Sequence, residues 1–143
     1  MPKLSTFMYC EEVVKNEQNN NQIMLRAPLT VFRPAFVPGM FSFSLVLGIS
    51  GIDPTSKEYK LQLKFFNPTL SDPIVDTGVI PIVHDPNQPK PTNDLPEEFQ
   101  GILVNLDFRN VVLKHEGEYF TEVILDGELL NRVPVYVKGA EQT

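Results

Sequence analysis

Prolines are spread through most of the chain, and they limit its fold more than any other feature. Thirteen prolines and eight glycines occur among 143 residues. Proline breaks helices and glycine weakens them, so helical bundles, coiled coils and enzymes of alternating strands and helices are disfavoured. Hydrophobic residues make up 42% of the chain, enough for a core without disulfides or metals. We expect a single domain over residues 1–143.

Apolar side chains recur at every second position in two segments, which is typical of a strand with one face on a core. In residues 41–50 the apolar face comprises Phe41, Phe43, Leu45, Leu47 and Ile49. In residues 59–66 it comprises Tyr59, Leu61, Leu63 and Phe65. The residues between the two segments carry turn chemistry, with Asp53 before Pro54. The pair is therefore the strongest hairpin candidate.

Several further segments indicate strands, and about eight are expected in all. They are residues 4–14, 23–31, 74–83, 102–109, 118–125 and 128–137. Asp126-Gly127 predicts a hairpin between the last two. Pro28 and Pro134 indicate edges or bulges, and a slip of phase at Asn110 indicates a bulge or a bend. The inner face of the last strand is expected to hold Leu129, Val133, Val135 and Val137.

Gly117 and Tyr119 precede a strand and a hairpin. This Gly-x-Tyr resembles the tyrosine corner of immunoglobulin-like and fibronectin-like domains, in which the tyrosine hydroxyl anchors the turn. The chain has no tryptophan and one cysteine, and Thr121 stands where antibody domains have their second cysteine. The final hairpin also resembles small uncharacterised bacterial or phage β-sandwich proteins. The resemblance implies an all-β, immunoglobulin-like antiparallel β-sandwich of about eight strands.

Charge and cysteine content restrict the partners and the compartment. The net charge of −6 disfavours nucleic-acid binding, which needs a basic surface. The single cysteine, Cys10, fits a reducing interior. We see no secretory signal and no apolar run long enough to cross a membrane. The cytoplasm is the expected location, with a phage particle or secretion without a signal left open.

The sequence offers no constellation for catalysis, a cofactor or a metal ion, so none is expected. Cys10 lies within an apparent strand, and the pattern brings neither histidine, His84 or His115, toward it. We expect a structural thiol. Acidic residues of several loops are candidates for a calcium site, although ordinary surface acids explain them equally well. These are Asp53, Asp72, Asp76, Asp94, Glu97 and Glu98.

Two segments have features of binding sites. Residues 32–41 place Phe32, Phe36 and Met40 around two prolines, which indicates either an exposed partner surface or a plug for one end of the core. We expect Phe36 and Met40 to be exposed. The spacing of Pro86, Pro89 and Pro91 fits a polyproline II ligand, and it fits a stiff connection better.

The leading functional hypothesis is a non-enzymatic protein-interaction module that binds through a sheet edge or through residues 32–41. A second copy of the chain is the simplest protein partner. The alternatives are a structural subunit of a phage or another assembly, and a carbohydrate-binding module. The absence of tryptophan disfavours the last of these. Neither nucleic acid nor a membrane is an expected partner.

Overall fold

The computed structural model describes residues 2–15, 23–53, 57–67, 69, 72–83 and 95–140. Within them the chain is almost entirely strand, with a single 3-10 turn, η1, at Glu97–Phe99. No helix in this described part is long and apolar enough to span a membrane. The strands are β1 (Lys3–Lys15), β2 (Ile23–Leu29), β3 (Val31–Phe32), β4 (Gly39–Ser50), β5 (Tyr59–Phe66), β6 (Val75–Asp76), β7 (Ile80–Ile82), β8 (Gly101–Leu113), β9 (Gly117–Leu125) and β10 (Glu128–Val137).

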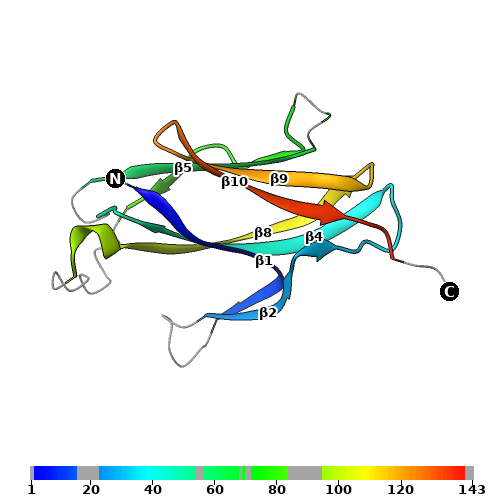
Figure 1. Cartoon of the computed structure of the whole chain (residues 1–143), viewed down its shortest axis with the longest axis horizontal. Coiled ribbons are helices and arrows are strands. Elements are labelled where there is room, and N and C mark those ends of the chain that lie inside the picture. The colour runs from blue at the N-terminus through cyan, green and yellow to red at the C-terminus, as the bar shows by residue number, and fades with distance from the viewer. Residues whose placement is uncertain are drawn as a thin grey trace.

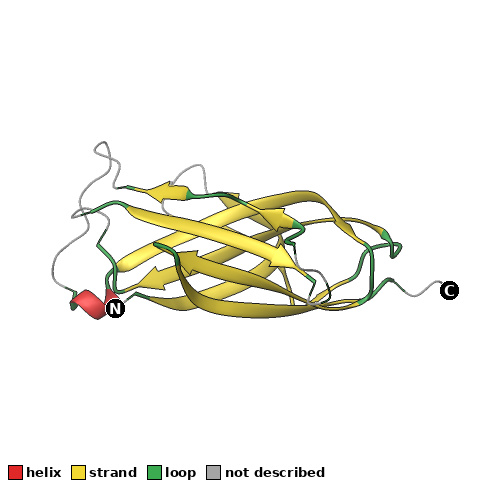
Figure 2. Ribbon diagram, turned by 90° about the horizontal axis from the view of Figure 1, so that it is seen from above, coloured by secondary structure: helices red, strands yellow, loops and turns green. Residues whose placement is uncertain are grey.

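The strands form two facing sheets, which confirms the predicted all-β sandwich (Figure 1). Sheet 1 has the order β2-β1-β4-β8, and sheet 2 has the order β3-β10-β9-β5-β6, with β7 also paired to β5. All pairs are antiparallel except the short pair of β3 with β10. Ten strands form in place of about eight, because β3, β6 and β7 are pieces of only two or three residues. Seen from above, the strands follow the long axis of the molecule (Figure 2).

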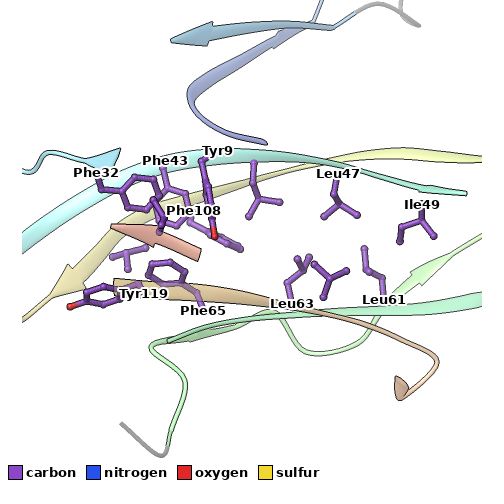
Figure 3. Packing of buried hydrophobic residues seen from close by; sticks show 14 of the residues in the cluster. Tyr9, Phe32, Phe43, Leu47, Ile49, Leu61, Leu63, Phe65, Phe108 and Tyr119 are labelled. Carbon is purple, nitrogen blue, oxygen red and sulfur yellow. The ribbon is translucent and has the colours of Figure 1, made fainter. Parts of the chain in front are cut away.

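The core lies between the sheets and has two zones (Figure 3). Aromatic side chains gather in one half, and leucine and isoleucine fill the other. The predicted inner faces of β4 and β5 are buried, apart from Phe41, which is partly exposed. Alternation places these residues on one side of each strand, and burying them drives the two sheets together.

The predicted hairpin of residues 41–50 with residues 59–66 is wrong. β4 belongs to sheet 1 and β5 to sheet 2, so the chain crosses from one layer to the other between them. Ile52 is buried in this connection, and the amide of Gly51 donates to the carbonyl of Gln100 at 2.7 Å. The connection therefore stays beside sheet 1 before it crosses to sheet 2. A tight hairpin turn between two paired strands would not take this path.

Leu129 was expected on the inner face of the last strand and is exposed instead. The pairing of β10 with β9 shifts register between Leu129 and Asn131. The irregularity reverses the direction of the side chains before it, because neighbouring strand residues face opposite sides. Val135 and Val137, beyond the shift, are buried as predicted, and Val133 is partly buried.

Turn and bulge residues behave as the sequence indicates. Asp126 and Gly127, with φ of 50° and 81°, join β9 to β10 as a hairpin. Pro28 lies in the edge strand β2 beside Ala27, whose φ is 54°. Asn110, with φ of 55°, lies opposite the register shift between β4 and β8, so the phase slip is a bulge.

Tyr9 connects the two sheets through the core. From β1 it lies 2.8 Å from the Thr121 Oγ1 of β9 and donates to the Val133 carbonyl of β10 at 2.8 Å. Burial raises the pKa of Tyr9 far above its ordinary value, so the phenol stays protonated. Thr121 is fully buried, so its hydroxyl depends on the contact with Tyr9 for a hydrogen-bond partner.

Candidate functional site

Residues 32–41 join sheet 2 to sheet 1 at one end of the sandwich. This end also holds the β8–β9 connection and the end of β10 (right side of Figure 1). Phe36 and Met40 are each 66% exposed. Phe32 is 0% exposed, so its assignment to a partner surface is wrong. It belongs to β3, whose pairing with β10 turns its ring toward Tyr9 and Phe43. The segment thus closes the core with Phe32, Val37 and Phe41 and exposes other side chains.

Val112 of β8 extends the exposed apolar area. It is the register partner of Met40 across the β4–β8 pair and is 43% exposed. Directly opposed side chains in antiparallel strands lie on the same face and within contact range. The backbone of Phe36 lies close to Gly39, the residue before Met40, because a Cβ placed on Gly39 would collide with the Phe36 carbonyl oxygen. We name Phe36, Met40 and Val112 the corner surface.

Both ends of the segment that carries Phe36 are held in place. The rings of Phe32 and Phe41, which flank it, have centroids 4.8 Å apart. After β10 the chain adds two backbone hydrogen bonds, from Lys138 to the Phe32 carbonyl at 3.0 Å and from Ala140 to the Pro34 carbonyl at 2.9 Å. The exposed side chains are therefore presented by an anchored backbone.

A hollow of about 290 Å³ lies beside the corner surface, and Val112 belongs to both. Its apolar lining includes Ile74 and the buried Tyr119, while its charged residues are exposed. Among the described residues, its lining is Asp72, Pro73, Ile74, Val112, Lys114, His115 and Tyr119. We name it the corner hollow.

The Tyr119 hydroxyl shapes this hollow by fixing the β8–β9 connection. It donates to the His115 carbonyl at 2.8 Å and accepts from the His115 amide at 3.3 Å. Glu116 in the same connection accepts from the Gly139 amide at 3.0 Å. The hydrogen bond from Tyr119 to the backbone four residues upstream is the contact that a tyrosine corner makes.

The corner hollow has features of a binding site and lacks an activated nucleophile. None of its lining residues within the described part of the chain is a serine, threonine or cysteine. Cys10 lies elsewhere, on β1, and is fully buried. Burial raises the pKa of its thiol, which keeps it protonated and poorly nucleophilic. Ser44, the register partner of Cys10, donates to the Asp107 carboxylate at 2.5 Å.

The calcium candidates do not come together in the described residues. There, no group of three or more histidine, cysteine or acidic side chains is placed to hold a metal ion. Asp76 instead accepts from the Gln62 side chain at 2.8 Å and from the Gly78 amide at 2.9 Å, and the Gln62 bond lowers its pKa. Asp94, His84, residues 86–91 and the side chain of Glu97 lie outside the described part of the chain.

Sequence patterns missed half of the site. Val112 and Ile74 are ordinary strand or loop residues in the sequence, and Asp72 was singled out only as a calcium candidate. Only the sheet topology brings the three to one corner. The phase slip before Val111 was the one local signal, because it reverses which residues of β8 face outward beyond Asn110.

No curated protein matches the sequence closely enough to suggest an activity. The strand order, the anchored corner and the hollow are therefore the observations from which a function has to be argued. One family model matches residues 5–138, nearly the whole chain, and the protein belongs to this DUF6941 family of unknown function.

Proposed function

We propose that the protein is a non-catalytic interaction module that docks a protein partner on its corner surface. The observation that carries this proposal is the exposure of Phe36, Met40 and Val112 at the same end of the sandwich, with Met40 and Val112 directly opposed. Grouped exposed apolar side chains with polar neighbours are characteristic of binding surfaces, whereas single ones are common and uninformative. Phenylalanine and methionine are also enriched in the cores of protein interfaces.

The corner hollow supports docking of an anchor side chain. Its apolar floor at Ile74 and Tyr119 suits an aliphatic or aromatic group, and its volume of about 290 Å³ is of side-chain size. Asp72 and Lys114 carry opposite charges at its rim, where polar groups of a partner would meet them. The surface and the hollow together form a hydrophobic centre with a polar border.

An immunoglobulin-like fold is part of the proposal. The order β10-β9-β5 matches strands G, F and C of such domains, and β1-β4-β8 matches A, B and E. Tyr119 lies at the start of the strand equivalent to F, with the backbone hydrogen bond expected there. The β1–β2 hairpin is an addition to that plan. Immunoglobulin-like sandwiches bind their partners through many different surfaces, so the fold alone does not identify the partner.

We further propose a bacterial or phage-encoded adaptor that acts in the cytoplasm. The single cysteine is buried and free, which suits a reducing compartment.

Affinity capture from the native host, read by mass spectrometry, tests the proposal. The wild type is compared with the double variant Phe36→Ser/Met40→Ser and with the control Phe99→Ser/Val79→Ser, which removes equally exposed apolar groups elsewhere. We expect the first variant to lose a partner that the wild type and the control retain.

Circular dichroism and thermal unfolding establish that all three proteins are folded. Equal capture of the partner by all three proteins would exclude the corner surface as the docking site. A wild type that captures no specific partner would refute the proposal that the protein is an interaction module.

A further inference from the structure

The edge strands of the two sheets differ sharply in how they are protected. β8 has 13 residues and, among the described residues, pairs only with β4. The other edges are shorter or carry a proline. β2 and β10 contain Pro28 and Pro134, β6 has two residues, and β7 has three, including Pro81. β1 is open only over residues 3–8, before its pairing with β2 begins. A long edge strand that has no proline, and no charged residue in its first half, can pair with a strand of another chain. Residues 101–106 of β8 carry no charge.

The backbone of β8 has a defined open side. The Gln100 carbonyl accepts from the Gly51 amide, so it points toward β4. Hydrogen-bonding direction alternates along an antiparallel strand, and Leu103, Asn105 and Asp107 therefore direct their N–H and C=O groups away from β4. Beyond Asn110 the bulge interrupts this regular edge. The regular open edge thus covers residues 101–109.

We propose that this edge pairs antiparallel with β8 of a second copy of the chain, so that two sandwiches share one continuous eight-stranded sheet. The dimer uses a surface separate from Phe36 and Met40, and the proposal does not depend on the corner surface. A two-fold axis near Asn105 places Leu103 opposite Asp107 of the other copy, and Gly101 opposite Arg109. Each contact then occurs twice, as in any isologous interface.

Charge favours a second copy over an unrelated strand. Glu98 lies just before β8, whereas Arg109 and Lys114 lie at its far end. All three are exposed, and none takes part in an ion pair between described residues. Antiparallel pairing brings the acidic start of each β8 to the basic end of the other, and a parallel arrangement would bring like charges together.

Pairing at this edge also covers apolar surface. Leu103 is 58% exposed on the outer face of sheet 1. On the inner face Ile102, Val104 and Leu106 are only partly buried, because β8 is the last strand of its layer. A second β8 would extend both faces over these side chains, adding apolar burial to the backbone hydrogen bonds.

Light scattering and sedimentation over a range of concentrations test the proposal on the full chain, without any other partner. The wild type is expected to form a dimer that weakens as salt is raised. Arg109→Glu and Glu98→Arg should each weaken it by about tenfold in Kd, and the double variant should restore it, since the swapped charges again attract. Lys60→Glu makes the same charge change at an exposed position on β5, in the other sheet, and should leave the dimer unchanged.

Asn105→Pro provides a second variant that acts through the backbone. It removes an N–H that points away from β4, so the β4 ladder is preserved while the new pairing is blocked. A monomeric wild type at all concentrations would overturn the proposal. So would a dimer that tolerates Asn105→Pro and both single charge variants. Slow amide exchange of Leu103 and Asp107 in dilute monomer would overturn it too, because the chain itself would then cover the edge.

Discussion

At the scale of single residues, the contact of Tyr9 with Thr121 has the largest consequence for the fold. Tyr9 of β1 and Thr121 of β9 join the two sheets through a hydrogen bond of 2.8 Å within the core. A buried hydroxyl that loses its partner keeps the full cost of leaving water. Removing one of the two hydroxyl groups should therefore destabilise the fold more than replacing both with apolar groups.

Tyr9→Phe is expected to lower the free energy of unfolding by about 1–3 kcal/mol, because it leaves Thr121 without its partner. Adding Thr121→Val should recover part of this loss, since both polar groups are then gone. Urea unfolding measures both. Tyr136→Phe, at an exposed ring, is the control and should change the free energy by less than about 0.5 kcal/mol. A double variant as unstable as the sum of its parts would contradict the pairing.

Tyr9→Phe should also change how the stability of the fold depends on pH in alkaline solution. The pKa of Tyr9 is raised by burial in the folded protein, whereas the unfolded chain releases this proton near pH 10. Stability is thus unaffected below about pH 10 and falls as the pH rises above it. Tyr9→Phe should show a shallower fall, measured as the free energy of unfolding against pH.

At the scale of elements, the bulge at Asn110 sets which residues of β8 face outward. Its φ of 55° is accessible to asparagine and glycine and is costly for β-branched residues. Its amide donates to Ser42 Oγ at 2.9 Å, which fixes the bulge against β4. The outward position of Val112 follows from this irregularity.

Asn110→Val should therefore destabilise the fold by about 1–2 kcal/mol, whereas Asn110→Gly should be nearly neutral. Chemical denaturation of both variants measures the difference. Equal destabilisation by valine and glycine would mean that the asparagine side chain matters more than the backbone angle.

Most strands could be predicted from the sequence, and their pairing could not. Period-two alternation reports one buried face, as in β4 and β5, and says nothing about which strand lies alongside. The β4–β5 connection carries turn residues and nevertheless crosses between the sheets. The β9–β10 hairpin was predictable because Asp126-Gly127 fixes a two-residue turn.

The candidate site was predictable only where the sequence itself was unusual. The aromatic residues and prolines of segment 32–41 marked a special segment, and the sequence left open which side chains it buries. The pairing of β3 with β10 decided that question for Phe32. Ile74 carried no local mark, and the phase slip at Asn110 was the only local sign for Val112, since their neighbours in space come from distant parts of the chain.

At the scale of the whole molecule, local stability should be highest in the central strands of the sandwich and lowest in the β1–β2 hairpin. β1 pairs with β4 only up to Cys10 and with β2 from Tyr9 onward, so the rest of the β1–β2 hairpin diverges from the two layers (Figure 1). Two-stranded ribbons are marginally stable by themselves. The central strands β4, β5 and β9, in contrast, carry most of the fully buried side chains.

Amide hydrogen exchange read by NMR should therefore be fast in residues 11–15 and 23–27 and slowest in β4, β5 and β9. The hairpin should also lose its protection at lower urea concentration than the core. Protection of the hairpin equal to that of β9 would show that it folds as one unit with the sandwich.

The contact between the rings of Phe32 and Phe41, whose centroids lie 4.8 Å apart, has a consequence for how Phe36 meets a partner. Ordering a loose loop on association costs conformational entropy, and that cost is subtracted from the affinity. Here folding of the aromatic core has already fixed both ends of the loop. A partner would gain contact with Phe36 and Met40 without having to order the backbone that carries them. Complexes of that kind can form without a prior rearrangement, so their lifetimes report the quality of the contacts themselves.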